Sequence, residues 1–152
     1  MFYGLFLCGY KRKYMWQQKE IILSPKPYGF HLITKEVIAE LPEIKNIEAG
    51  LLHILIQHTS AGLTLNENAD STVRSDFKRF IYDLVFKENG YFEHIDEGDD
   101  DMPAHIKSSL IGAQLSLPIS NGRLQLGVWQ GIYLGEFRKR AGNRRLFITI
   151  QS

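Results

Sequence analysis

Three histidines are the residues whose type and position suggest chemistry. His58 closes an apolar run at residues 49–58, and His94 and His105 bracket a turn-rich loop. All three imidazoles could converge on one point. Three neutral imidazoles leave an open position on a zinc-type ion, which is typical of a catalytic rather than a structural site. The spacing matches no recognised zinc pattern, so the sequence offers this metal site as a hypothesis.

The loop between the second and third histidines is strongly acidic. Residues 93–101 carry the carboxylates of Glu93, Asp96, Glu97, Asp99, Asp100 and Asp101 and no basic side chain. Such a run is usually a solvated loop. Beside bound metal, its carboxylates could instead orient the imidazole rings, or hold Mg²⁺ together with a substrate phosphate.

Two further segments place polar groups among apolar ones. Thr59 and Ser60 follow His58 and lead to Asn66 and Glu67, which indicates either a site at a strand end or a loop whose hydroxyls bond the backbone. Gln130 lies in the glycine-rich segment 127–138. Glycines there indicate bulges or close backbone approach beside a ligand.

A basic cluster follows, formed by Arg138, Lys139, Arg140, Arg144 and Arg145. It could bind phosphate through bidentate guanidinium contacts, or it could be a solvated hairpin tip. Glu136 precedes the cluster and, in the simpler interpretation, pairs with Arg138 or Arg144.

Composition excludes several classes of protein. The only cysteine, Cys8, rules out an internal disulfide framework and a cysteine-based zinc site. A net charge of +1 over 152 residues gives no electrostatic basis for binding nucleic acid or a membrane. No nucleophile motif, phosphate-binding glycine loop or Rossmann pattern is present.

Hydrophobic periodicity predicts one α+β domain dominated by antiparallel sheet. Residues 70–88 repeat apolar side chains every three or four positions, which predicts a long helix; shorter helices are expected at 34–41 and 103–110. Asn121-Gly122 predicts a hairpin turn. Strands are expected at 18–23, 30–34, 49–58, 114–119, 123–129, 131–138 and 145–151.

The ends of the sequence differ in character. Residues 1–14 place an apolar stretch before a basic run, the reverse of a secretory signal, and are too short to span a bilayer. The segment could act as a weak membrane-surface anchor, but we expect an N-terminal extension at 1–14 and a single domain at 15–152. Because no other apolar run reaches spanning length, we expect a cytoplasmic protein.

The blocks at 58–70 (HTSAGLTLNENAD), 91–112 and 122–145 resemble the YjbQ family, and the resemblance extends from Met15 to the C-terminus. It implies a two-sheet antiparallel β-sandwich with one long and one short helix, assembled as a homotrimer. It also implies a divalent metal, zinc or similar, at His58, His94 and His105, with Mg²⁺ possible beside a phosphorylated substrate.

The same resemblance implies the secondary thiamine-phosphate synthase reaction, which joins a pyrimidine diphosphate to a thiazole phosphate with loss of pyrophosphate. The family motif places further residues around the pocket. We expect catalytic roles for Glu67, Gln130 and Glu136, and substrate-binding roles for Thr59, Ser60, Asn66 and Arg145. Two alternatives remain: a metal-dependent hydrolase of a phosphorylated metabolite, with Glu67 or Glu136 as general base, and a non-catalytic trimeric metal- or ligand-binding protein.

Overall fold

The computed structural model describes residues 15–85 and 90–152. The extension expected at residues 1–14 lies outside the described residues.

The larger of two sheets has five antiparallel strands in the order β1-β8-β3-β5-β6. They are β1 (Trp16–Leu23), β3 (Ala49–Ile56), β5 (Gln114–Ser120), β6 (Arg123–Leu124) and β8 (Arg144–Gln151). β3 and β8 bury alternate residues, as expected for strands with one face on a core. The hairpin between β5 and β6 forms as predicted, with positive φ at Asn121 and Gly122.

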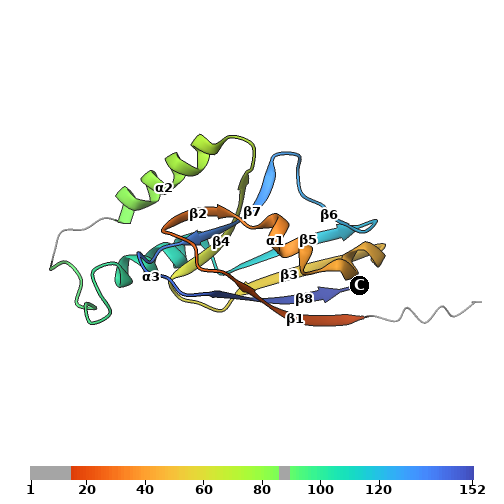
Figure 1. Ribbon diagram of the computed structural model, residues 1–152, viewed down its shortest axis with the longest axis horizontal. Helices are drawn as coiled ribbons and strands as arrows, with labels where there is room; N and C mark the ends of the chain where they lie inside the picture. The colour runs from red at the N-terminus through yellow and green to blue at the C-terminus, as the bar shows by residue number, and fades with distance from the viewer. Residues whose placement is uncertain (1–14, 86–89) are drawn as a thin grey trace, which may run out of the picture.

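The smaller sheet has three antiparallel strands in the order β2-β7-β4. They are β2 (Gly29–Leu32), β4 (Ala61–Glu67) and β7 (Gln130–Glu136). The predicted mainly-β fold with two antiparallel sheets is therefore confirmed (Figure 1).

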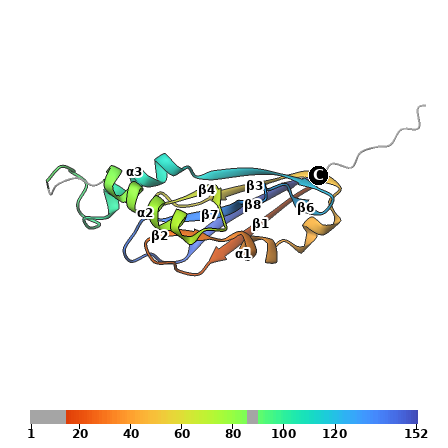
Figure 2. The ribbon, with the colours of Figure 1, turned by 90° about the horizontal axis from the view of Figure 1, so that it is seen from above.

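Within the described residues, four helical segments connect the strands. They are α1 (Thr34–Ala39), the 3-10 helix η1 (Pro42–Asn46), α2 (Ser71–Val85) and α3 (Asp101–Ile111). α2 and α3 pack against the three-stranded sheet, through β2 and β4 respectively. In Figure 1, α2 lies on the side of this sheet away from β1 and β8, and Figure 2 shows α2 and α3 side by side from above.

The three-stranded sheet has a hydrophobic core on each face. The first core fills the space between the sheets with aliphatic side chains such as Leu52, Ile54, Leu63, Leu134 and Ile148. The second, smaller core is built on Phe30, Ile81, Ala104, Tyr133 and Phe137, beneath α2 and α3. Because both faces of β7 are covered, it is almost completely buried, which matches its run of apolar and small residues.

Three sequence predictions about elements were wrong. No strand was predicted at residues 61–67, which form β4 because they pair with β7, a strand distant in the sequence. The strand predicted at 123–129 ends at Leu124. The residues that follow leave the sheet and form a turn, in which Gln130 donates its backbone N–H to Gly127 O. The helix predicted from Pro103 begins at Asp101. This last shift matters for the site.

No helix within the described ranges is long and apolar enough to cross a bilayer.

Candidate metal centre

His94, Asp101 and His105 form a tight cluster at the start of α3. Asp101 Oδ2 lies 2.9 Å from His94 Nε2 and 3.1 Å from His105 Nε2. One ligand atom from each side chain lies within 4.8 Å of the others. The carboxylate is 2% exposed, whereas His94 is 46% exposed, so the cluster opens to solvent on one side only.

The hydrogen bonds of His105 determine where its proton lies. Its Nδ1 is 2.9 Å from the backbone oxygen of Thr59, and a carbonyl oxygen can only accept, so Nδ1 carries the hydrogen. If the ring is neutral, Nε2 then carries a lone pair, and this lone pair faces the carboxylate of Asp101. Two acceptors in contact require a cation between them, either a proton or a metal ion.

The position of Asp101 follows from the local sequence. α3 starts at Asp101, so Asp101 and His105 are four residues apart on one helix and share a face. Our prediction started this helix at Pro103, which left Asp101 in the solvated loop. The i,i+4 spacing of a carboxylate and a histidine was the signal that could have revealed it.

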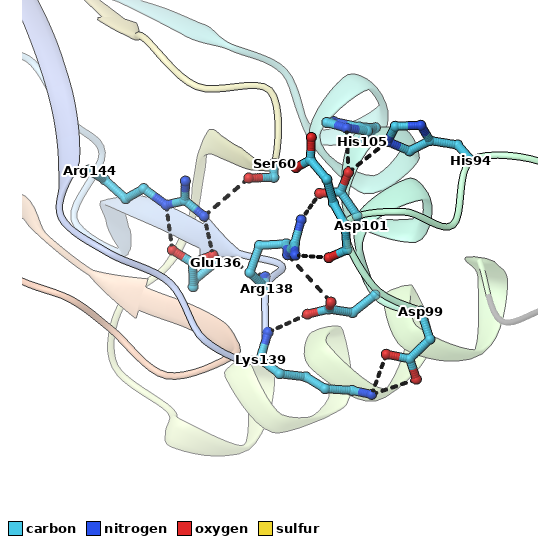
Figure 3. A network of polar contacts seen from close by, with 11 residues as sticks. Ser60, His94, Asp99, Asp101, His105, Glu136, Arg138, Lys139 and Arg144 are labelled. Atoms are coloured by element: carbon cyan, nitrogen blue, oxygen red, sulfur yellow. Dashed lines mark hydrogen bonds and ion pairs between the residues drawn. The ribbon is translucent and has the colours of Figure 1, made fainter.

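Arg138 holds the other oxygen of Asp101. Its guanidinium pairs with Asp101 Oδ1, lies 3.4 Å from Asp100 Oδ1 and donates to the backbone oxygen of Glu97 at 2.7 Å. Figure 3 shows Arg138 between the histidine cluster and a second ion pair. Arg138 therefore fixes the acidic loop and leaves Asp101 Oδ2 for the two imidazoles.

The second ion pair joins the two sheets at this end of the sandwich. Arg144 of β8 donates through Nε and Nη2 to the two oxygens of Glu136 of β7, at 2.7 and 2.6 Å. Both side chains are buried, and Glu136 also accepts the backbone N–H of Arg138. The alternative in which Glu136 pairs with Arg144 is therefore the observed one, and neither Glu136 oxygen lacks a donor.

His58 lies beside this ion pair and outside the tight cluster. Its Nδ1 is 3.3 Å from Arg144 Nη1, and its Nε2 accepts the backbone N–H of Arg145 at 2.8 Å. Burial, together with the positive charges of Arg144 and Arg145, lowers the pKa of His58 below its usual value, although Glu136 opposes them. His58 is thus kept as a neutral imidazole.

A hollow of about 540 Å³ connects His58 with the cluster. It is lined by His58, Thr59, His105, Ser108, Ser109, Gly112 and Ala113. His58 and His105 thus face one space, although His58 does not belong to the tight cluster of His94, Asp101 and His105.

Comparison with known proteins decides the family. A family model described as "UPF0047 protein YjbQ-like" matches residues 19–152. The chain belongs to the YjbQ family. It is 54% identical to the UPF0047 protein YjbQ of Escherichia coli over 137 residues, covering 90% of this chain and 99% of the relative.

Solved structures of YjbQ relatives share the fold. A Clostridium acetobutylicum protein of the YjbQ/UPF0047 family is 33% identical, with a TM-score of 0.72 over 86% of this chain and 97% of that one. A Sulfolobus solfataricus protein described as YbjQ-like and of unknown function, 22% identical, gives a TM-score of 0.77 over 91% and 99%. The family is thus one of uncharacterised proteins.

The YjbQ-like blocks do not all meet at one place. Thr59, Ser60, Glu136 and Arg145 lie near His58, and Ser60 Oγ accepts from Arg144 Nη2 at 3.2 Å.

Asn66, Glu67 and Gln130 lie at the opposite end of β4 and β7, about 20 Å away along seven residues of strand. There Glu67 Oε1 accepts the N–H groups of Ala69 and Asp70. Gln130 Oε1 accepts the N–H of Gly127. Within one chain, these residues shape the turns on either side of their strands.

Proposed function

We propose that this YjbQ-family protein binds a divalent metal ion through His94, Asp101 and His105. The observation that carries the proposal is the convergence of three ligand atoms within 4.8 Å of one another, with His105 Nε2 and Asp101 Oδ2 3.1 Å apart. A metal-ligating histidine commonly donates its other N–H to a backbone carbonyl, as His105 does to Thr59. The donor set of two imidazoles and one carboxylate suits zinc and related ions.

The proposed centre is of the catalytic type. Three protein ligands would leave room for a water or substrate, and a divalent ion held by them would supply positive charge to stabilise a departing pyrophosphate. Arg138 neutralises the second oxygen of Asp101 and keeps the carboxylate oriented. The neutral His58 lines the adjoining hollow, and to serve as a further metal ligand it must release its contact with Arg144 or Arg145.

We propose a small phosphorylated metabolite as the substrate. The reaction implied by the family resemblance is thiamine-phosphate synthesis. In it the thiazole nitrogen bonds to the methylene carbon of the pyrimidine diphosphate while the carbon–oxygen bond to pyrophosphate breaks. An open metal site suits the pyrophosphate leaving group. The alternative reaction, hydrolysis of a phosphorylated metabolite, would use a metal ion held by the same three ligands, His94, Asp101 and His105.

Metal binding is tested first, by calorimetric titration of the chelator-treated protein with Zn²⁺, Mn²⁺ and Co²⁺. We expect one ion per chain, and we expect the double variant His94→Ala/His105→Ala to lose binding. His53→Gln is the matched control, because His53 lies on β3 and bonds Ser116. No binding by the wild type, or equal binding by the double variant, contradicts the proposal.

The predicted third histidine is tested in the same titration. If His58 acts as a ligand, His58→Ala weakens metal binding by at least about tenfold, which corresponds to about 1.4 kcal/mol. If His58 acts only in the hollow, binding of the metal stays within about twofold of the wild type.

Activity separates an enzyme from a binding protein. We expect the wild-type protein to restore growth of a strain that cannot make thiamine phosphate, and we expect the His94→Ala variant to fail. Equal growth with both proteins shows that this centre does not support the reaction. Growth with neither, while metal binding persists, favours the non-catalytic alternative.

A further inference from the structure

A second hollow lies at the end of the five-stranded sheet, on the other side of His58. It has a volume of about 480 Å³ and is lined by Ile22, Gln57, His58, Asn143 and Arg145. β8 supplies Arg145, the turn before β8 supplies Asn143, and the end of β3 leads into Gln57 and His58. The hollow thus combines one cationic and three other polar side chains.

Its hydrogen-bond donors are not used within the fold. The guanidinium of Arg145 and the side-chain amides of Gln57 and Asn143 make no hydrogen bond or ion pair with any residue in 15–85 or 90–152. By contrast, the neighbouring Arg144 is fully engaged with Glu136. The unpaired hydrogen-bond donors therefore lie on one side of His58, and the paired guanidinium of Arg144 lies on the other.

The charge of the hollow is positive. No carboxylate is among its lining residues, and the buried Glu136 already neutralises Arg144. A guanidinium presents a planar fork of N–H donors that matches an oxyanion, and amide groups add single donors.

The hollow adjoins the proposed metal centre. His58 lines both this hollow and the one that contains His105 and Ser109. A ligand that reaches across His58 can thus place one end against Arg145 and the other beside His105.

We propose that the hollow of Gln57, His58, Asn143 and Arg145 is a binding subsite for a phosphate group of an organic ligand. Arg145 binds two of its oxygens, and the amides of Gln57 and Asn143 bind the rest. That the other end of the ligand reaches the metal centre rests on the proposed function. Binding of phosphate in the hollow does not.

The test uses the chelator-treated protein, so that no metal contributes. The full chain is titrated with inorganic phosphate and, separately, with methyl phosphate, while NMR follows the side-chain N–H signals of Gln57, Asn143 and Arg145. We expect both ligands to shift these three signals, with affinities within about twofold of each other. No shift, or binding of inorganic phosphate alone, overturns the proposal.

Matched arginine variants separate a built subsite from general positive charge. Arg145→Gln is expected to weaken binding by at least about tenfold, whereas Arg140→Gln removes a charge from the same turn but lines no part of the hollow and should change affinity less than about twofold. Equal weakening in both variants overturns the subsite. Since the Arg145 side chain is exposed and unpaired, both variants should keep the wild-type unfolding midpoint.

The two proposals fail separately. If the chelator-treated protein binds phosphate but the metal titration is blank, the metal centre is wrong and the subsite stands. If metal binds but phosphate does not shift the three side chains, the subsite alone is wrong.

Discussion

Lys107 is a buried charge that the candidate site does not use. It lies on α3, is 4% exposed, and donates to the hydroxyl of Tyr28 at 3.1 Å. Its ammonium also lies 5.0 Å from the ring centre of Tyr28 and 5.3 Å from that of Tyr82. Burial lowers the pKa of Lys107, and burial followed by the proximity of Tyr82 raises the pKa of Tyr28 to about 12. This contact ties α3 to α2 and to the loop before β2.

Tyr28→Phe tests that contact. Loss of a hydrogen bond to a charged group is expected to lower the free energy of unfolding at pH 7 by about 1.5–3 kcal/mol, measured by urea denaturation. Because the pKa of Tyr28 is higher in the folded state, its protonated form adds stability below about pH 10 that is lost as the pH rises toward 12. The variant should lack that alkaline loss. The control is the same substitution made in a Lys107→Met background, where the partner is absent, and an equal loss in both backgrounds contradicts the assignment.

At the scale of elements, β4 and α3 approach each other at Gly62. A methyl group added there would lie 2.9 Å from Gly112 O and 3.0 Å from Ile111 Cγ2. The same contact is held by hydrogen bonds from Leu63 N to Gly112 O and from Ser108 Oγ to Ala61 O. Since β4 follows His58 and α3 carries His105, this packing sets the distance between the two histidines.

Gly62→Ala is therefore expected to destabilise the fold by about 1–3 kcal/mol through overpacking. The matched control is Gly142→Ala, where an added methyl group meets nothing within 4 Å. Chemical denaturation measures both variants. An unchanged midpoint for Gly62→Ala is the result that refutes the close-packing argument.

Two basic side chains, Arg138 and Lys139, contact the acidic loop at residues 93–101, and we expect them to differ in their effect on metal binding. Arg138 contacts Asp101, Asp100 and the backbone of Glu97, whereas the Lys139 side chain pairs with the exposed Asp99. We expect Arg138→Gln to weaken metal binding about 10- to 100-fold, as loss of a hydrogen bond to a metal ligand commonly does. We expect Lys139→Gln to leave it unchanged.

The readout for the loop is twofold. Titration with Co²⁺ reports both affinity and the visible spectrum of the bound ion, and a purely structural role of Arg138 leaves that spectrum unaltered. Hydrogen exchange of residues 94–101 reports whether the loop is released. If the Arg138→Gln variant binds Co²⁺ with the affinity and the visible spectrum of the wild type, Arg138 does not orient the Asp101 carboxylate.

At the scale of the whole molecule, the two faces of the five-stranded sheet differ. One face covers the core, and no helix of residues 15–85 or 90–152 packs extensively on the other. Away from the hollow that Ile22 lines, that outer face carries apolar side chains at Leu51 and Leu55, which are 40% and 37% exposed. We propose, as the family resemblance implies, that the chain forms a homotrimer, and that this part of the face contributes to the contact between copies.

Leu51→Asp tests the assembly. A charge placed among apolar contacts is expected to shift the mass from trimer to monomer, as measured by light scattering after gel filtration. Asp83→Lys on α2, a helix that packs against the other sheet, serves as a surface-charge control and should keep the wild-type mass. A wild-type protein that is monomeric at all concentrations contradicts the trimer.

Sequence alone determined the class of the fold and much of its framework. Periodicity located α2 and most strands, Asn121-Gly122 located the β5–β6 hairpin, and the family blocks implied two antiparallel sheets. These features follow from local rules, because apolar spacing and turn chemistry act over a few neighbouring residues. The short β4 was missed, since its burial depends on β7, which lies more than sixty residues further along the chain.

Only the tertiary structure decided which polar residues meet. It brought His94 and His105 together with Asp101, left His58 against Arg144 and Arg145, and separated Glu67 and Gln130 from all of them. The sequence showed that histidine and carboxylate side chains are the groups available for a site. Their partners were not, because the choice depends on where α3 begins and on how the two sheets close around a buried ion pair.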